Sequence, residues 1–330
     1  MPKSILFIID DIELKYFEFN DLVTDFWWIK EFLKRGYKVD VSLKGDLFIE
    51  NAKGCAFSRT TYLKEENIFY NKELNKHLIN DYDVVFFRPD PPVDINYIST
   101  CYVFDYVDKE KTLLINDPTE VKNFNEKFHV NYFPEFAPEN IVSSSVELIM
   151  DFVEKKKEAI LKPLNRCFGS GVYYLNSEDK NLLTILSTMT ENGKTPVMVQ
   201  TYLPDAKNGD KRVLIIGETV LDECIQKLPG DNNFKFSTHS DKFFKATKLT
   251  ENEKNMAQVI ANKLSKKGLY LVGLDVINEK VIEINVTSPC YFIREINQNY
   301  GINFEDKIMK HLEDMIEKHF SKERQYASKR

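Results

Sequence analysis

Three oxygen-bearing side chains interrupt an otherwise apolar stretch, LYLVGLDVINEKVIEINVTSPCYFIRE, at residues 269–295. Glu283 and Asn285 are two residues apart, so on a β-strand both point to the same face. Asp275 ends the preceding apolar run, and the short connection INEK predicts an antiparallel hairpin that brings the three side chains together. Two carboxylates and an amide oxygen suit Mg²⁺ or Mn²⁺ rather than Zn²⁺. Taken alone, the same pattern also fits solvent-facing residues of an edge hairpin.

Basic residues end two other apolar runs. Lys162 lies in AILKPL, where an ammonium group is costly to bury unless an anion pairs with it. Arg88 follows VVFF and precedes prolines, which places a guanidinium for a two-point contact with a carboxylate. The plainer interpretations are that Lys162 extends to solvent and that Arg88 forms a structural salt bridge.

Charge and composition exclude several classes of protein. A formal net charge of −6 argues against a surface that coats nucleic acid or an anionic membrane. Five cysteines without regular spacing predict neither a disulfide framework nor a zinc site, and they favour a reducing compartment. Apolar runs stay well short of the roughly 20 residues of a membrane helix. We expect a cytoplasmic enzyme without nucleic-acid or membrane partners.

The first part of the chain, residues 1–122, alternates strand and helix patterns. KSILFIIDD reads as a buried strand that meets Asp10 and Asp11 at once, and the periodic run from Thr24 reads as a helix closed by Gly36. Further strands are predicted in YDVVFFRPDPP and KTLLINDPTE. This alternation favours a parallel, doubly wound α/β domain.

Residues 123–318 predict an α+β domain with a central lobe at 123–200 and a C-terminal lobe at 201–318. Helices are expected in NEKFHVNYF and, at the end of the domain, in NFEDKIMKHLEDMIEKHF. One hairpin is expected between AILKPL and GVYYLN, another around Gly217, and a strand in VMVQT. A polar tail follows at 319–330. Capping boxes are predicted for Ser144 with Glu147 and for Thr250 with Glu253.

The segment KKGLYLVGLDVINEKVIEINVTSP, followed by IREI, resembles the C-terminal signature of bacterial-type glutathione synthetases, which are ATP-grasp ligases. FFRPDPPVD, INDP, NEK, ILKPL, YLPDAKNGDKRVL and KLP occur in the family's order, so the resemblance covers essentially the whole chain. It implies a pre-ATP-grasp α/β domain followed by an ATP-grasp domain, whose two antiparallel-sheet lobes hold ATP between them.

The resemblance also implies roles for individual residues. The cofactor-binding positions, for ATP, are Lys127, Lys162, Gly169, Gln200, Tyr202, Leu203, Asp210, Arg212 and Lys227. The substrate positions are Arg88, Asn285, Ser288 and Arg294, and the ligands of Mg²⁺ or Mn²⁺ are Asp275, Glu283 and Asn285. Arg212 and Lys162 are the expected catalytic residues, because such ligases work by positioning and charge neutralisation without a protein nucleophile.

The activity that the resemblance implies is the ATP-dependent joining of γ-glutamylcysteine and glycine through an acyl phosphate, with release of ADP and phosphate. Members of the family form tetramers, so a homo-oligomer is expected. Water must be kept from the acyl phosphate, which predicts that a closing loop covers the site.

Two loops depart from the family pattern. NRCFGSG carries Arg166, Cys167 and Phe168 where a glycine-rich run is usual, and residues 230–245 carry phenylalanines and lysines where the family's lid has glycines. One extra residue also stands between Pro289 and Ile293. Two alternatives therefore stay open: a peptide ligase with a different acid or amine, and a degenerate ATP-binding regulatory protein.

Overall fold

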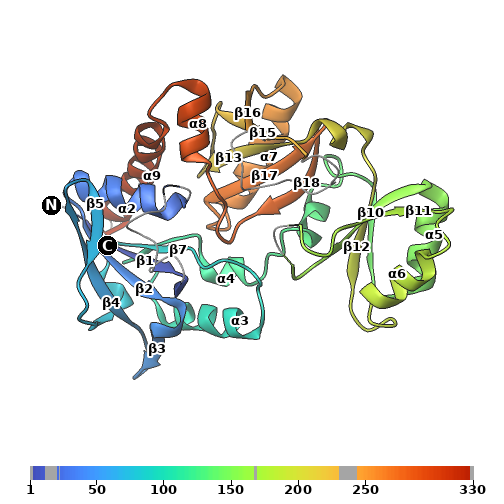
Figure 1. Ribbon diagram of the computed structural model, residues 1–330. Coiled ribbons are helices and arrows are strands. Elements are labelled where there is room, and N and C mark those ends of the chain that lie inside the picture. The colour runs from blue at the N-terminus through green and yellow to red at the C-terminus, as the bar shows by residue number, and fades with distance from the viewer. Residues whose placement is uncertain (1–2, 12–20, 22, 167–168, 230–243, 328–330) are drawn as a thin grey trace.

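The computed structural model describes residues 3–11, 21, 23–166, 169–229 and 244–327. Within these residues the chain forms an N-terminal mixed sheet followed by two antiparallel sheets (Figure 1). The predicted lid at 230–243 lies outside the described residues. None of the helices in the described part of the chain is long and apolar enough to cross a membrane.

Parallel strands form the centre of the N-terminal sheet, as predicted. They are β1 (Ser4–Ile9), β2 (Lys38–Leu43), β7 (Val84–Phe87) and β8 (Leu113–Ile115), in the order β2-β1-β7-β8. Helix α2 (Thr24–Lys34) packs on one face, beside Phe7 and Phe86. Helix α3 (Ile95–Cys101) packs with Leu6 and Phe87, which point to the other face. The apolar sequences of the strands follow from this double coverage.

An antiparallel extension widens this sheet, and the sequence analysis did not predict it. Strands β3 (Leu47–Glu50), β5 (Asn67–Tyr70) and β6 (Asn75–Leu78) all pair with the long strand β4 (Lys53–Lys64), which itself runs antiparallel to β2. The extension leaves residues such as Phe57 and Tyr62 partly exposed, so its strands lack the uniformly apolar sequences of the centre.

The first antiparallel sheet has the order β11-β10-β12-β9. Its strands are β9 (Asn140–Ser143), β10 (Glu158–Pro163), β11 (Tyr173–Asn176) and β12 (Val197–Thr201), and the predicted β10–β11 hairpin is confirmed. Helices α5 (Val146–Lys156) and α6 (Leu182–Met189) cover one face. The predicted cap of α5 is wrong by one residue: the hydroxyl of Ser145, and not Ser144, accepts from the Leu148 N–H at 3.3 Å.

The second antiparallel sheet has the order β16-β15-β13-β17-β18, and β14 also pairs with β13. Its strands are β13 (Asp210–Ile216), β14 (Thr219–Val220), β15 (Cys224–Lys227), β16 (Phe244–Thr247), β17 (Leu271–Ile277) and β18 (Lys280–Asn285). Helix α7 (Glu251–Ser265) starts at the predicted Thr250–Glu253 capping box. The β17–β18 hairpin is confirmed, with Asp275 opposite Glu283 and a turn at Asn278 and Glu279, both at positive φ.

The C-terminal helices return to the N-terminal domain. Helix α8 (Ile293–Tyr300) leads into α9 (Phe304–Ala327), which lies beside α2 (Figure 1). The Tyr37 hydroxyl donates to Glu313 of α9 at 3.0 Å. Helix α9 continues to Ala327, where the sequence predicted a polar tail, because SKERQYA contains no helix breaker.

A buried asparagine ties the N-terminal domain to the second antiparallel sheet. Asn116, just before α4 (Pro118–Val121), accepts from the Tyr270 and Leu271 N–H groups and donates to the carbonyls of Leu271 and Val286, all at 2.7–2.8 Å. The segment after it, predicted as a helix, forms a 3-10 turn at Phe128–Tyr132. These contacts set the N-terminal domain against the β17–β18 hairpin.

Candidate active site

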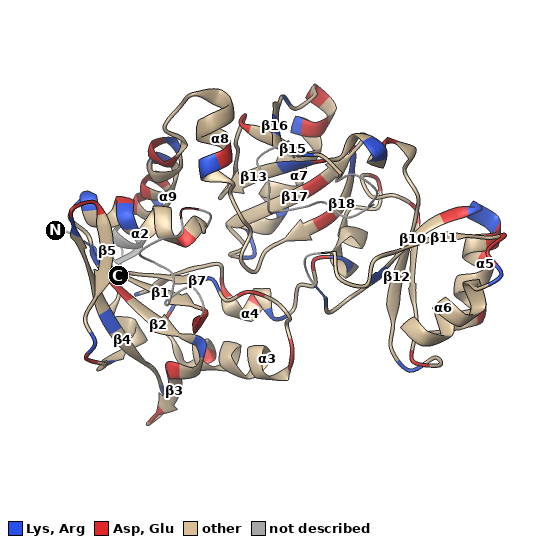
Figure 2. Ribbon diagram, viewed as in Figure 1, with Lys and Arg blue, Asp and Glu red and all other residues tan. Residues whose placement is uncertain are grey.

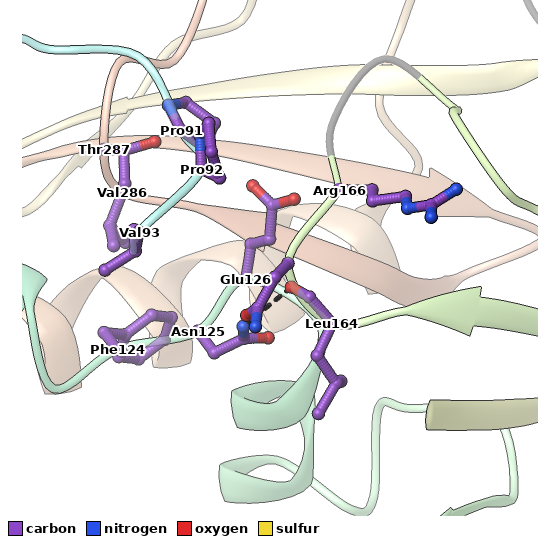
Figure 3. Close-up of a pocket in the computed structure, with 11 residues that line it drawn as sticks. Pro91, Pro92, Val93, Phe124, Asn125, Glu126, Leu164, Arg166, Val286 and Thr287 are labelled. Atoms are coloured by element: carbon purple, nitrogen blue, oxygen red, sulfur yellow. Dashed lines mark hydrogen bonds between the residues drawn. The ribbon is translucent and has the colours of Figure 1, made fainter. Parts of the chain in front are cut away.

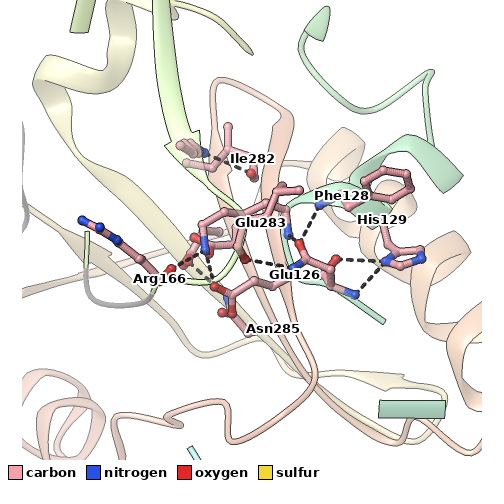
Figure 4. A network of polar contacts seen from close by, with 12 residues as sticks. Glu126, Phe128, His129, Arg166, Ile282, Glu283 and Asn285 are labelled. Carbon is pink, nitrogen blue, oxygen red and sulfur yellow. Dashed lines mark hydrogen bonds and ion pairs between the residues drawn. The ribbon is translucent and has the colours of Figure 1, made fainter. Parts of the chain in front are cut away.

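A polar network joins the two antiparallel sheets (Figure 4). The Lys162 ammonium of β10 donates to the carbonyl of Ile282 on β18 at 3.2 Å. Burial lowers the pKa of Lys162, while the Glu283 carboxylate partly offsets this effect. Lys162 is 7% exposed, so the interpretation that it extends to solvent does not hold.

Asp275 is the centre of the charge network on the second sheet. The Arg212 guanidinium donates to both of its oxygens, from Nε at 2.8 Å and from Nη2 at 3.1 Å, and the Lys227 ammonium lies 2.9 Å from Oδ1. Burial alone would raise the pKa of Asp275, but Arg212 and Lys227 hold it well below its usual range. The carboxylate is therefore ionised across the whole physiological pH range. Figure 2 shows both basic and acidic residues on this sheet.

Asp210 shares the Lys227 ammonium, at 2.6 Å from Oδ2. Burial raises the pKa of Asp210 to about 7, against the effect of Lys227. Its Oδ1 atom and the Nε2 atom of Gln200 are buried and have no hydrogen-bond partner among the described residues. Such atoms cost free energy unless a ligand satisfies them. Each of the two atoms could be satisfied by a polar ligand such as a nucleotide.

Glu283 faces a second lysine. Its Oε1 atom lies 3.0 Å from the ammonium of Lys127, which also contacts the Glu126 carboxylate and donates to the Arg166 carbonyl at 2.8 Å (Figure 4). Burial would raise the pKa of Glu283, but Lys127 and Lys162 lower it. Lys127 is 4% exposed, so its ammonium is buried within this network.

Glu126 belongs to this network, and the sequence analysis did not select it. Burial and the neighbouring Glu283 raise the pKa of Glu126 to about 8, although Lys127 opposes this shift. The signal in the sequence was its place beside Lys127 in NEK. Its role stayed hidden because Glu283, its acidic neighbour in space, lies far away along the chain.

The predicted metal ligands gather on the β17–β18 hairpin. Asp275 pairs with Glu283 across the strands, and the Asn285 amide donates to Asp275 Oδ2 at 3.3 Å. Among the described residues, no three His, Cys, Asp or Glu side chains form a metal-binding group; the expected set has two carboxylates and an amide. Oxygen donors of these types fit a hard cation. Asp275, Glu283 and Asn285 are the residues that would hold it.

The remaining positions expected to bind ATP lie after β12, at Tyr202 and Leu203, and in the loop between β10 and β11, at Gly169. The Tyr202 N–H donates to the Glu158 carbonyl at 3.2 Å, and its ring packs edge-on against Tyr174. Leu203 follows it and leads into β13, so the pair forms the connection between the two antiparallel sheets. Gly169 adopts a φ of +67°, which a glycine accommodates without strain.

Arg88 lies in a second, acidic cluster at the carboxyl ends of β1 and β7. It is 2% exposed, its Nε donates to Asp25 at 2.8 Å, and its Nη2 donates to the Pro289 carbonyl at 3.1 Å. Its guanidinium also lies 5.0 Å from the centre of the Trp28 ring. These contacts agree with the structural interpretation of Arg88, and Asp25 is a partner that the sequence did not reveal.

The other predicted substrate residues occupy the edges of this cluster. The Ser288 hydroxyl donates to Asp90, whose backbone N–H donates to Asp10 at 2.6 Å. Burial raises the pKa of Asp90. Arg294 instead contacts Glu295 at 3.0 Å and Asp21 at 3.7 Å, on the outer side of α8. The structure therefore brings Arg88 and Ser288 together around Pro289 and leaves Arg294 apart.

A short segment connects the two clusters. Arg88 binds the carbonyl of Pro289, and Arg212 binds the carbonyl of the next residue, Cys290, at 3.2 Å. A narrow pocket, about 20 Å³, lies near this segment, between residues 91–93, 124–126, 164–166 and 286–287. The Glu126 carboxylate points into it, whereas the Arg166 side chain points away (Figure 3).

Comparisons with known proteins agree with this arrangement. The prokaryotic glutathione synthetase N-terminal domain matches residues 4–122, and the prokaryotic glutathione synthetase ATP-grasp domain matches residues 126–301. A glutathione synthetase of Vibrio parahaemolyticus is 33% identical over 295 residues, which are 89% of this chain and 93% of that protein. One from Nostoc is 39% identical over 236 residues, 71% of this chain and 72% of that protein.

Solved structures confirm the fold. D-cycloserine synthetase DcsG superposes with a TM-score of 0.65 at 13% identity, over 95% of this chain and 99% of that one. D-alanyl-alanine synthetase A from Vibrio cholerae superposes with a TM-score of 0.59 at 12% identity, over 96% and 98%. At such identities these likenesses concern the fold alone. With two family domains matched in order across most of its length, the chain belongs to the prokaryotic glutathione synthetase family and is an ATP-grasp ligase.

Proposed function

We propose that the chain is a glutathione synthetase, which joins γ-glutamylcysteine to glycine with the consumption of ATP and with Mg²⁺ or Mn²⁺ as its metal. The observation that carries the proposal is the network of Lys127, Lys162, Arg212 and Lys227 around the carboxylates of the β17–β18 hairpin. Relatives that align with most of this chain are named glutathione synthetase.

The basic residues are placed to neutralise phosphate. Lys162 lies on β10 of the first antiparallel sheet, and Lys127 lies in the turn that precedes this sheet. Arg212 and Lys227 lie on β13 and β15 of the second antiparallel sheet. When bound, ATP supplies the phosphoryl group that activates the acid substrate. Arg212 and Lys162 then stabilise the negative charge that develops on transfer, through preformed positions that need no rearrangement of solvent.

The acid substrate is proposed to bind near Arg88 and Ser288. Ser288 belongs to the 288–290 segment, and Arg88 donates to its Pro289 carbonyl. Arg212 donates to the Cys290 carbonyl of the same segment from the proposed nucleotide side. This continuity would bring a substrate carboxylate from the N-terminal domain toward the phosphate-binding residues. A guanidinium suits such a carboxylate because it can donate two parallel hydrogen bonds.

A ligase with another acid or amine is the second candidate. The observation that favours it is Arg166, an exposed arginine where the family has small residues; its Nη1 lies 3.1 Å from the position that a Cβ on Gly171 would occupy. A bulky cation there changes the loop beside the nucleotide. It would alter substrate choice without affecting the hairpin carboxylates.

ATP consumption by the purified chain, measured against a panel of dipeptides and amines, tests the proposal. We expect ADP formation to require γ-glutamylcysteine, glycine and Mg²⁺ or Mn²⁺ together, with glutathione identified by mass. Turnover with a different pair would support the second candidate. ATP binding without turnover on any pair would favour a regulatory protein.

Cellular setting and assembly are part of the same proposal. We infer a cytoplasmic homo-oligomer, since the family resemblance implies tetramers. Light scattering of the purified chain would contradict this if it gave the mass of one copy, 38.6 kDa.

A further inference from the structure

His129 lies directly behind the loop that carries Lys127. Its imidazole stacks on the Phe124 ring at 4.6 Å and packs against Tyr132 at 4.7 Å and Phe128 at 5.3 Å. Figure 4 shows it at one end of the polar network, with Glu126 and Glu283 further along. A ring held on three sides by aromatic groups has a fixed orientation.

One ring nitrogen of His129 binds the backbone of the loop. The Asn125 N–H donates to Nδ1 at 2.7 Å, so in this arrangement Nδ1 is the unprotonated nitrogen. The backbone N–H of His129 in turn donates to the Asn125 carbonyl at 3.0 Å. The imidazole therefore closes a ring of hydrogen bonds that begins and ends on Asn125.

Asn125 passes this constraint to the site. Its Oδ1 atom accepts from the N–H of Lys127 at 3.0 Å and from the N–H of Phe128 at 2.9 Å. Its Nδ2 atom donates to the Leu164 carbonyl at 2.9 Å, two residues after Lys162. Asn125 thus fixes the backbone at Lys127 and the loop that follows Lys162, the two lysines proposed to bind phosphate.

We propose that His129 is a positioning residue for nucleotide binding: its neutral imidazole, by accepting from Asn125, holds the loop from Asn125 to Lys127 in register with the loop after β10. The inference rests on the proposed function only in taking ATP as the ligand of Lys127 and Lys162. His129 itself is not among the residues proposed to bind ATP or the metal.

Protonation breaks this arrangement. An imidazolium carries a hydrogen on Nδ1, which would face the Asn125 N–H, donor against donor, across 2.7 Å. Nδ1 also lies 3.1 Å from the Asn125 carbonyl, and the protonated ring would donate there instead. The Asn125 N–H would then lose its acceptor, and the loop would have to move.

The surroundings favour the neutral ring. Burial is the main cause that lowers the pKa of His129, and Lys267 adds to the effect. Lys263 packs over the Tyr132 and Phe133 rings, and Lys267 is paired with Glu120 at 3.0 Å. Because the pKa is lowered, the neutral, loop-holding form persists at pH values below the ordinary pKa of histidine, and it is lost only as the pH falls through the lowered pKa of the folded protein.

Two variants separate the acceptor from the aromatic packing. His129→Phe keeps a ring among Phe124, Phe128 and Tyr132 but has no acceptor. His129→Asn loses the ring but offers an amide oxygen near the position of Nδ1, and it does not titrate. His77→Asn, on β6 in the N-terminal sheet, is the matched control for loss of a histidine elsewhere.

The first measurement is the Kd of a non-hydrolysable ATP analogue with Mg²⁺, by calorimetry of the full chain between pH 5.5 and 8.5. Because Glu126 and Asp210 titrate in the same range, each pH profile is compared with that of His129→Asn. The unmodified chain and His77→Asn should lose about five- to tenfold more affinity than His129→Asn between pH 8 and pH 5.5, the effect of one lost buried hydrogen bond. His129→Phe should bind weakly at both pH values, and His129→Asn should approach the unmodified affinity with a flatter profile.

The second measurement needs no nucleotide. Hydrogen exchange of the peptide spanning residues 124–129, corrected for the intrinsic pH dependence, should be faster in His129→Phe than in the unmodified chain at pH 8. If exchange and affinity in His129→Phe both match the unmodified chain, His129 has no positioning role. If the exchange difference appears but no form binds the nucleotide, the proposed function fails while the role of His129 in the loop stands.

Discussion

At the residue scale, the charges of the site divide between two carboxylates with different neighbours. Asp275 is surrounded by Arg212 and Lys227, whereas Glu283 faces Lys127. A single hairpin therefore presents its acids to basic groups from several elements. Each carboxylate keeps its charge because burial is offset by those partners.

Glu283 is the residue whose change should be most damaging. Replacing it with Gln removes one charge from the proposed metal site and should lower metal-dependent ATP turnover about a hundredfold or more. Glu279→Gln, on the turn of the same hairpin, should leave turnover unchanged. Steady-state ADP release and circular dichroism would be compared for both. Normal turnover in Glu283→Gln would remove the hairpin from the metal site.

Arg88 distinguishes a substrate role from a structural one. Arg88→Lys should weaken acid-substrate binding at least tenfold with the Kd for ATP unchanged, because an ammonium cannot reproduce two guanidinium contacts in fixed geometry. Thermal unfolding must be measured in parallel, since Asp25 would lose part of its buried partner.

Arg59→Lys, at a partly exposed pair with Asp46, is the control. An equal loss of ATP affinity in Arg88→Lys would mean that Arg88 serves the nucleotide side. Loss of stability with unchanged substrate affinity would leave Arg88 with a purely structural function.

At the element scale, a glycine allows the strands that carry Asp210 and Lys227 to approach each other closely. Gly209 has a φ of +91°, and a Cβ there would lie 1.9 Å from the carbonyl oxygen of Lys227. The close approach lets β13 and β15 pair directly at their ends. The ion pair between Asp210 and Lys227 depends on that pairing.

Gly209→Ala should therefore push the ends of β13 and β15 apart, in addition to straining the backbone at residue 209. We expect the free energy of unfolding to fall by about 3 kcal/mol or more, with nucleotide binding lost. Gly36→Ala is matched in φ, at +80°, but a Cβ there meets nothing within 4 Å, so it should cost only about 1 kcal/mol. Urea denaturation of both variants checks the difference; equal costs would mean that β15 adjusts to the methyl group.

At the scale of the whole molecule, Asn116 holds two domains in register. All of its described contacts are with the main chain of residues 270–271 and 286. Those residues lie at the start of β17 and just after the end of β18. The position of the N-terminal domain is thereby linked to the hairpin that carries Asp275, Glu283 and Asn285.

Asn116→Ala would leave these buried main-chain groups without partners. We expect the free energy of unfolding to fall by about 3 kcal/mol and acid-substrate affinity to fall with it, because Arg88 and Ser288 meet across this junction. Asn123→Ala, which removes only an exposed bond to the Thr119 carbonyl, should change stability by less than about 0.5 kcal/mol. Unchanged substrate affinity in a folded Asn116→Ala protein would separate domain docking from substrate binding.

The sequence by itself determined the parts of this protein that depend on local pattern. Two apolar runs joined by a short connection predicted the hairpin, and the spacing of two residues predicted the shared face of Glu283 and Asn285. Uniformly apolar runs, alternating with helix patterns, predicted the parallel centre of the first sheet. The ordered motifs then identified the family. These features could be predicted because strand periodicity and short motifs depend only on residues that are neighbours in the sequence.

Only the tertiary structure decided which charges meet. Glu126 approaches Glu283, Asp25 binds Arg88, and His129 orders the loop of Lys127, yet the sequence singled out none of the three. The strands β3 to β6 were missed for a related reason: their half-exposed faces carry no uniform apolar run. Each of these features depends on burial and on partners distant in the chain, and so on packing that no local pattern encodes.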